Sequence, residues 1–362
     1  MKKMLKLALI FSLFLPVTLT GICSIDVDGC SFMNDGCCVL GRYVRLLFCR
    51  ERVPIRGEEI LLCALDRRAS WDSTAEEMNL FQSICISSSV ERIYYSCFRA
   101  RQGLIAITFE SGSKLSRIDA SAFSLCSFLR CICIPSSVEE LGRECFEECS
   151  SLTTVTFERG SKLSQIYEAA FSFCFSLSSI CIPSTVNNLG KECFHLCRSL
   201  IAVTFESGSQ LSSIEEAAFC SCSSLRSICI PSTVNQLGKE CFLLCSRLIF
   251  VTFDSGSQLS SIGKRTFSNC SSLSSICIPS SVTCLGKRCF DECYGLKTVS
   301  FEGKSQLSKI GDGAFFNCSS LTVFCVPFSV RRLGEECFTG CSSLAIVPSF
   351  VGLSFPIIEW DV

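Results

Sequence analysis

Residues 122–152, AFSLCSFLRCICIPSSVEELGRECFEECSSL, contain the motif from which most of the chain is built. A leucine of this motif recurs at positions 104, 129, 152, 177, 200, 225, 248, 273, 296, 321 and 344, in steps that alternate between 25 and 23 residues. Two steps make a 48-residue unit, so Leu115 recurs as Leu163, Leu211, Leu259 and Leu307. A fixed period of this length is typical of a solenoid, in which each turn buries its apolar edge against its neighbours. We therefore expect one elongated body.

Each turn contains one predicted strand. Leu129, Ile132 and Ile134 follow an L-x-x-I-x-I spacing, and the two isoleucines point to the same side of a strand. Pro135 has no amide hydrogen for a ladder and ends the strand. Residues 138–149 carry apolar side chains at helix-like offsets and predict a short helix or 3₁₀ turn on the outer side. The expected fold class is an α/β repeat solenoid, with one short parallel strand per turn of 23–25 residues and short helical or 3₁₀ outer segments.

One phenylalanine per turn is expected to fill the core. These residues lie at positions 98, 123, 146, 171, 194, 219, 242, 267, 290, 315 and 338, with the same alternating steps as the leucines. Large rings at one fixed place per turn are the usual filler of a stacked core, and an aromatic binding stripe is the alternative. About twelve strands at a spacing of roughly 4.8 Å give an inner sheet on the order of 50 Å long.

The segments 122–152 and 314–344 resemble the BspA-like class of leucine-rich repeat, whose pattern is A-F-x-x-C-x-S-L-x-x-I-x-I-P-x-S-V-x-x-I-G. The resemblance covers residues 80–347, or roughly three quarters of the chain. It implies a leucine-rich repeat fold and use in cell-surface and secreted adhesion or interaction proteins of bacteria and protists. The chain departs from the pattern in alternate turns, where cysteine replaces the small residue before phenylalanine, at Cys97, Cys145, Cys193, Cys241, Cys289 and Cys337.

Four parts are expected along the chain. Residues 1–20 place two lysines before an apolar run and resemble a secretory signal, with an uncleaved anchor as the alternative. Residues 21–79 form a cysteine-containing N-terminal cap, residues 80–348 the solenoid, and residues 349–362 a C-terminal cap. Lipidation of Cys23 is disfavoured because Ile22 stands where a small residue is required. We expect a secreted or cell-surface protein whose only membrane contact is through the signal segment, if that segment is not cleaved.

The balance of acidic and basic residues excludes some classes of binding partner. The 33 Lys and Arg residues nearly equal the 34 Asp and Glu residues, which gives a net charge of −1. The chain therefore offers no overall basic attraction for nucleic acid and no polybasic membrane patch. A protein or a cell-surface polymer is the expected partner, with neither nucleic acid nor a small-molecule substrate.

The 31 cysteines fall into groups with different expected roles. One group faces outward from the strands at 48-residue intervals, so its members lie roughly 9.6 Å apart, beyond the reach of about 7 Å that a disulfide allows. Its members are Cys85, Cys133, Cys181, Cys229, Cys277 and Cys325. A second column has a member in every turn, close enough to pair, but we favour free buried thiols there. Its members are Cys126, Cys149, Cys174, Cys197, Cys222, Cys245, Cys270, Cys293, Cys318 and Cys341. A local disulfide cluster is expected only among Cys23, Cys30, Cys37, Cys38, Cys49 and Cys63.

Catalytic and metal-binding patterns are weak. The single histidine, His195, lies on the outer segment, so Ser-His-Asp and Cys-His arrangements cannot be built. The C-x-x-x-C spacing of Cys145 and Cys149 recurs with a phenylalanine in its middle and belongs to the repeat rather than to a zinc site. We expect no enzyme activity, no catalytic residue, no metal and no cofactor.

The outward face of the sheet is the expected binding surface. Its small hydroxyl and thiol side chains allow close approach, with few of the Trp, Tyr and Arg anchors of tight interfaces. The candidate contacts are Thr108, Cys133, Thr154, Thr156, Ser179, Cys181, Thr204, Ser227, Cys229, Phe250, Thr252 and Cys277. An acidic column at the strand ends, with steps of roughly 10 Å, adds Glu110, Glu158, Glu206, Asp254 and Glu302. The alternative for this column is that each carboxylate caps the amides of the Gly-Ser loop that follows it.

The sequence is compatible with three functions. The expected one is a non-enzymatic protein–protein interaction or adhesion protein that binds through the inner sheet and the strand-end loops. An effector acting in a reducing host compartment is the first alternative, because unpaired thiols persist best there. An enzyme with a thiol nucleophile on the inner face is the second, and a single thiol of outlying reactivity would favour it.

Overall fold

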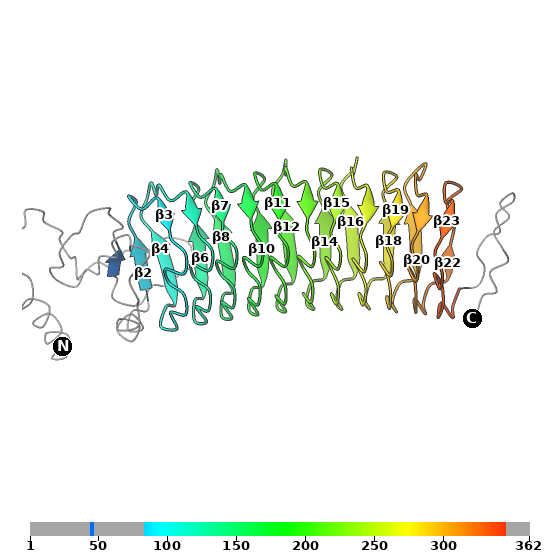
Figure 1. Cartoon of the computed structure of the whole chain (residues 1–362), viewed down its shortest axis with the longest axis horizontal. Helices are drawn as coiled ribbons and strands as arrows, with labels where there is room; N and C mark the ends of the chain where they lie inside the picture. The colour runs from blue at the N-terminus through cyan, green and yellow to red at the C-terminus, as the bar shows by residue number, and fades with distance from the viewer. Residues whose placement is uncertain (1–43, 47–82, 345–362) are drawn as a thin grey trace, which may run out of the picture.

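The computed structural model describes residues 44–46 and 83–344, which form an elongated β-solenoid (Figure 1). Successive turns of this solenoid stack with their strands parallel. The larger sheet has twelve strands in chain order, and all are parallel, so the predicted strands and their parallel stacking are confirmed, although each turn also adds a second, shorter strand to another sheet. The strands are β1 (Val44–Leu46), β2 (Ser83–Ile86), β4 (Ala106–Phe109), β6 (Cys131–Ile134), β8 (Thr154–Phe157), β10 (Ser179–Ile182), β12 (Ala202–Phe205), β14 (Ser227–Ile230), β16 (Phe250–Phe253), β18 (Ser275–Ile278), β20 (Thr298–Phe301) and β22 (Val323–Phe324). The predicted signal segment, the C-terminal cap, the cysteine cluster at 23–63 and all of the N-terminal cap except β1 lie outside the described residues.

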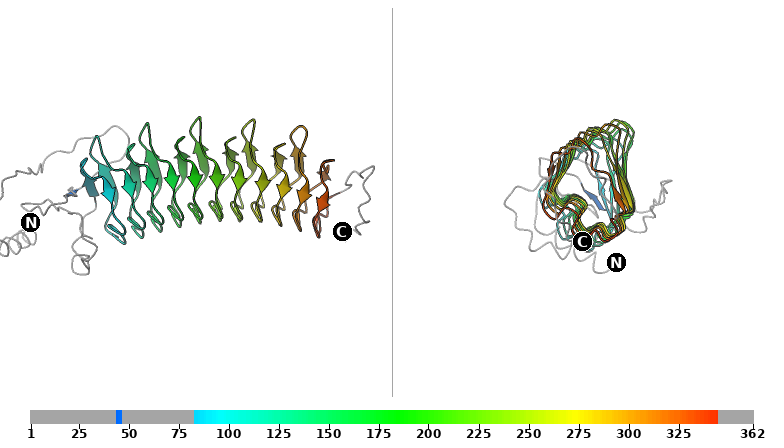
Figure 2. Two further views of the ribbon diagram at one scale, coloured as in Figure 1. Left: turned by 45° about the horizontal axis from the view of Figure 1, so that its top comes forward. Right: turned by 90° about the vertical axis from the view of Figure 1, so that its right-hand side faces the viewer.

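A second sheet runs along the other side of the stack (Figure 2). It has eleven parallel strands of two residues each, and the sequence did not predict it, because two residues are too few to show an alternating pattern. Its strands are β3 (Arg92–Ile93), β5 (Arg117–Ile118), β7 (Glu140–Leu141), β9 (Gln165–Ile166), β11 (Asn188–Leu189), β13 (Ser213–Ile214), β15 (Gln236–Leu237), β17 (Ser261–Ile262), β19 (Cys284–Leu285), β21 (Lys309–Ile310) and β23 (Arg332–Leu333). The second residue of each pair points inward, as buried Leu141 does.

The predicted helical or 3₁₀ outer segments are wrong: residues 83–344 contain no helix, so this part of the chain is all β and turn rather than α/β. In residues 142–149 the amides of Cys145 and Cys149 close short turns on the carbonyls three residues back, at 3.3 and 3.2 Å. The amide of Phe146 between them donates to Ala170 of the next layer at 2.8 Å. Glu144 and Glu148 have φ values of 56° and 57°, and this left-handed conformation interrupts a helix at every fourth residue.

The phenylalanine spine is the core of the stack. From Phe98 to Phe338 each ring lies 5.0–5.5 Å from the next, with interplanar angles of 1–10°. All these rings are buried, so the alternative of an aromatic binding stripe is wrong. Rings in equivalent positions stack face to face because the layers repeat at the strand spacing.

Buried thiols accompany each ring. Cys126 Sγ donates to the carbonyl oxygen of Phe98 at 3.0 Å, and Cys149 Sγ donates to that of Phe123 at 3.2 Å. The same bond recurs along the whole second column. Burial raises the pKa of the Cys126 thiol to about 12. All 25 cysteines of the described residues are free, and those of the spine act as small buried donors that satisfy backbone carbonyls.

Glycines set how closely neighbouring layers approach. A Cβ on Gly190 would lie 2.6 Å from the carbonyl carbon of Tyr167 and 2.7 Å from the amide nitrogen of Glu168, both in the preceding layer. Gly142 lies two layers before Gly190 and Gly238 two layers after it, and each makes the equivalent contacts with its own preceding layer. These positions accept no side chain unless the layers separate.

Gly190→Ala is therefore expected to lower the free energy of unfolding by about 1–3 kcal/mol, since the added methyl overlaps fixed backbone. The matched control is Ser207→Ala on an exposed loop, where the expected change is within about 0.5 kcal/mol. Chemical denaturation of both variants under reducing conditions measures the difference, and equal midpoints would contradict the close-packed layer geometry.

Candidate interaction surface on the larger sheet

The outward face of the larger sheet carries an alternating row of thiols and hydroxyls. Cys181 of β10 pairs in register with Thr204 of β12, and Cys229 of β14 pairs with Thr252 of β16. The same pairing joins the other strands along the row, as Cys85 with Thr108, Cys133 with Thr156, and Cys277 with Ser300. Inward residues on either side of this row, such as Ile180 and Ile182, are buried in the core. The strand alternation thus fixes which side chains reach solvent.

The structure brings all the predicted contact residues to this one face and its edge. Thr108 and Glu110 are half-buried, and the others are exposed: Cys133, Thr154, Thr156, Ser179, Cys181, Thr204, Ser227, Cys229, Phe250, Thr252, Cys277, Glu158, Glu206, Asp254 and Glu302. Phe250 is the largest side chain among them, with 52% of its surface exposed. The face is otherwise built from small polar groups.

Three of the five carboxylates in the acidic column cap a turn, but not the turn that the sequence suggested. Glu206 Oε2 accepts a hydrogen bond from the amide of Ser184 at 2.9 Å, and Glu158 Oε2 accepts one from the amide of Ser136 at 2.9 Å. Glu110 binds the amide of Ser88 in the same way, at 2.9 Å. Each serine belongs to the short turn of the preceding layer, so the alternative of a cap on the following Gly-Ser loop is wrong. Sequence alone did not reveal this bond because it joins residues 22 positions apart.

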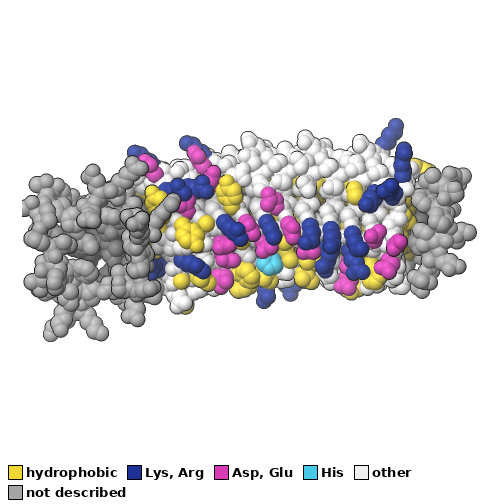
Figure 3. Space-filling view, in the orientation of Figure 1, with side chains coloured by type: hydrophobic (Ala, Val, Ile, Leu, Met, Phe, Trp, Pro, Cys, Tyr) yellow, Lys and Arg dark blue, Asp and Glu magenta, His cyan; other side chains and the backbone are white. Residues whose placement is uncertain are grey.

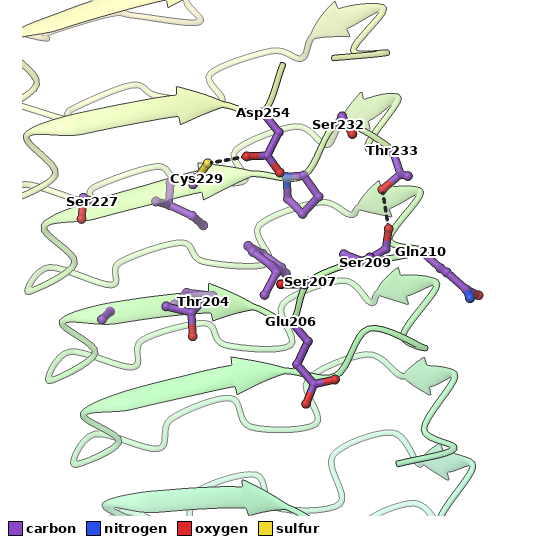
Figure 4. A pocket seen from close by; sticks show the side chains of 16 residues that line it. Thr204, Glu206, Ser207, Ser209, Gln210, Ser227, Cys229, Ser232, Thr233 and Asp254 are labelled. Carbon is purple, nitrogen blue, oxygen red and sulfur yellow. Dashed lines mark hydrogen bonds between the residues drawn. The ribbon is translucent and has the colours of Figure 1, made fainter. Parts of the chain in front are cut away.

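Asp254 occupies the equivalent position but makes a different bond. Its side chain is one methylene shorter than glutamate, and its Oδ1 accepts a hydrogen bond from Cys229 Sγ at 3.1 Å (Figure 4). Within residues 83–344, neither Asp254 nor Glu302 hydrogen-bonds the turn of the preceding layer, whereas Glu110, Glu158 and Glu206 do. The other four repeats have glutamate at this position and only this one has aspartate. That difference is the sequence signal that could have identified this layer.

A hollow of about 820 Å³ lies at this place (Figure 4). Its walls are the ends of β12 and β14, the loop 206–210, the turn 231–233 and Asp254. Figure 4 shows the Asp254 carboxylate turned toward Cys229, whereas the Glu206 carboxylate points away toward the preceding layer. The hollow is therefore lined by Asp254, by Glu206, whose carboxylate is bound to the preceding layer, and by several serine and threonine residues.

Within residues 83–344, Cys229 is the outward thiol that hydrogen-bonds a carboxylate. Burial raises the pKa of this thiol, the hydrogen bond with Thr252 lowers it, and the Asp254 carboxylate raises it further. The carboxylate therefore disfavours the thiolate and does not activate a nucleophile. His195 does not line the hollow; it lies edge-on to Phe173, with the ring centroids 5.5 Å apart.

The side of the stack that carries His195 differs from the sheet face, because it is rich in charged side chains. Figure 3 shows acidic and basic side chains mixed in a band along the stack, with the histidine among them. Many of these charges are paired, as Lys239 with Glu216 at 3.1 Å and Arg143 with Glu144 at 3.0 Å. This band offers a partner little unbalanced charge.

Residues 44–46 and 83–344 hold no group of three His, Cys, Asp or Glu side chains arranged for a metal ion. Over the same ranges, no helix has the length and apolar character needed to cross a bilayer.

Replacement of Asp254 by Asn is expected to speed alkylation of Cys229 by iodoacetamide at pH 8 by about two- to fivefold. Without the carboxylate the raised pKa falls, so a larger fraction of the thiol is thiolate at that pH. Peptide mass spectrometry gives the rate at each thiol, and Cys181 in the same sample is the internal control. An unchanged or slower rate at Cys229 would show that Asp254 does not control this thiol.

Asp254→Glu is expected to raise the free energy of unfolding by about 0.5–1 kcal/mol, because the longer side chain can bind the amide of Ser232 as Glu206 binds that of Ser184. The reverse substitution, Glu206→Asp, should lower it by a similar amount. Denaturant midpoints under reducing conditions measure both, and shifts in the same direction would contradict the capping role.

Comparison with known proteins agrees with this geometry. A profile of the BspA type leucine rich repeat region, with six copies, matches residues 76–201, 160–257 and 250–348. No curated protein sequence is significantly similar to the chain.

Solved structures show the same fold. A leucine-rich repeat protein from Bacteroides ovatus is 25% identical, with a TM-score of 0.50 over 73% of this chain and 77% of that protein. Lower similarity is found to a leucine-rich repeat protein from Eubacterium ventriosum, at 20% identity and a TM-score of 0.47 over 78% and 87% of the two chains. The pneumococcal vaccine antigen PcpA is 21% identical, with a TM-score of 0.44 over 74% and 80%. The profile spans most of the chain and the stack has the corresponding architecture, so the protein belongs to the BspA type leucine-rich repeat family.

Proposed function

We propose that the protein is a non-enzymatic interaction or adhesion protein that binds a partner through the outward face of the larger sheet and the loops at the strand ends. The observation that carries this proposal is the row of small side chains on the outward face, which are paired in register from β2 to β20 and exposed from β6 to β20. The match to BspA type repeats supports a binding role, because repeat solenoids present extended surfaces that suit binding.

The size of the face suits one protein partner. The ten four-residue strands from β2 to β20, at about 4.8 Å between strands and about 3.3 Å per residue, give on the order of 630 Å², close to the roughly 800 Å² that each partner contributes to a stable complex. Small side chains lose little conformational entropy on binding, which favours association through many weak contacts. Phe250 is a large, exposed apolar residue on the face and a candidate anchor.

We place the protein at the cell surface or in the extracellular medium. Residues 1–20 have the charge and apolar pattern of a secretory signal, which supports export. The partner is then a protein or a cell-surface polymer. The near-balance of 33 basic and 34 acidic residues disfavours nucleic acid.

A second candidate is an effector that acts inside a reducing host compartment. The 25 free thiols of the described residues favour it, because five of them are exposed and oxidise readily outside cells. Alkylation of the native protein, followed by mass spectrometry, distinguishes the two locations. Nearly complete modification of the exposed thiols favours the reducing compartment, and extensive oxidation favours permanent residence outside.

Three lysines on the sheet face, in the variant Thr156→Lys/Thr204→Lys/Thr252→Lys, are expected to weaken binding to an immobilised extracellular-matrix extract by at least about tenfold. The long side chains hold a partner away from the small-residue face and leave the core intact, since all three threonines are exposed. Biolayer interferometry of the wild type and the variant measures the change.

The matched control places three lysines on the other side of the stack, at Ser212, Gln236 and Thr283, which are also exposed. It should bind within about twofold of the wild type, since it adds the same charge elsewhere. Equal loss in both variants would mean that charge alone acts, and no loss in either would reject the sheet face as the binding surface.

A further inference from the structure

The long Gly-Ser loops divide one edge of the stack into notches. These loops span residues 110–114, 158–162, 206–210, 254–258 and 302–306, and they project from alternate turns (Figure 2). Between two of them lies a layer with a short Pro-Ser turn, so each notch has a long loop on either side. The notch above β14 is the hollow described above, and Asp254 is part of its lining.

The local charge distinguishes this notch from its neighbours. The first two loops carry cations beside their glutamates, namely Lys114, Arg159 and Lys162. The loops that flank the hollow have Gln210 and Gln258 at the positions of those lysines. No lysine, arginine or histidine lines the hollow, so the charge of Asp254 is not neutralised within it.

The remaining lining groups are suited to a donor-rich cation. Hydroxyls of Ser207, Ser209, Ser227 and Ser232 line the hollow and can accept hydrogen bonds. A guanidinium group presents five donors in a planar fork, whereas a lysine ammonium is a compact and strongly hydrated point charge. A partner carboxylate is disfavoured by repulsion from Asp254.

From these observations we infer that the notch above β14 binds the side chain of an arginine on the partner protein. The guanidinium donates to the Asp254 carboxylate and to the surrounding serine hydroxyls. This inference rests on the proposed function, since it names the chemistry that one part of the same surface recognises. In the notch on one side the Glu206 carboxylate is already bound to the turn at Ser184. On the other side the loop that carries Glu302 also carries Lys304. Both differences favour the layer of Asp254 for the arginine site.

The probe is the peptide acetyl-Ala-Gly-Arg-Gly-Ala-amide, titrated with the full-length protein and followed by NMR line broadening. Its counterpart with citrulline has nearly the same shape but no charge. We expect the arginine peptide to bind at least about fivefold more tightly than the citrulline peptide, and the difference to vanish in Asp254→Asn. The Asp254→Glu variant should also bind weakly, because the longer side chain fills the notch and turns toward Ser232.

Glu158→Gln is the matched control, since it removes a carboxylate from a neighbouring notch whose side chain is bound to a turn. It should bind the arginine peptide within about twofold of the wild type. Equal binding of both peptides, equal binding by the wild type and Asp254→Asn, or no binding of the arginine peptide would overturn the inference. If the sheet-face lysines still abolish binding to matrix in that case, only the arginine site fails and the proposed function stands.

Discussion

The structure depends on one constraint: each layer must lie in register on the layer before it. Parallel backbone hydrogen bonds fix the strand spacing on both sheets, and the phenylalanine spine fills the space between them with rings 5.0–5.5 Å apart. Neither feature can shift alone, because a one-residue slip would move Ile180 and Ile182 from the core to solvent. Position 190 and its equivalents are occupied by glycine for the same reason, since a side chain there would overlap the backbone of the preceding layer.

The same constraint makes the surface periodic. Whatever occupies an outward position in one turn is repeated about 5 Å or 10 Å away, so the sheet face becomes a regular row of thiols and hydroxyls. A residue that differs from its equivalents in the other turns therefore makes one layer of the surface locally different. Asp254 is such a residue: its carboxylate accepts a hydrogen bond from Cys229 and lines the hollow beside β14, whereas Glu110, Glu158 and Glu206 bind a turn of the preceding layer.

Sequence reasoning predicted the parts of the fold that repetition encodes. The spacing of Leu129, Ile132 and Ile134 predicted the strands of the larger sheet, and the phenylalanine steps predicted the core. The outer segments were predicted wrongly, because residues in left-handed conformations at Glu144 and Glu148 produce turns with apolar spacings that imitate a helix. Glu206 was placed correctly at the strand end, but its partner Ser184 lies in another layer, and the pairing of side chains between layers is not encoded in local pattern.

The central claim, that each turn adds one layer to a single continuous wall, can be measured with spin labels on the outward thiols. With the other exposed cysteines replaced by serine, electron–electron double resonance between labels on Cys181 and Cys277 should give a distance of about 19 Å, and between labels on Cys133 and Cys325 about 38 Å. These values correspond to four and eight steps along the sheet order. Distances that do not grow in proportion to the number of intervening strands would contradict the account.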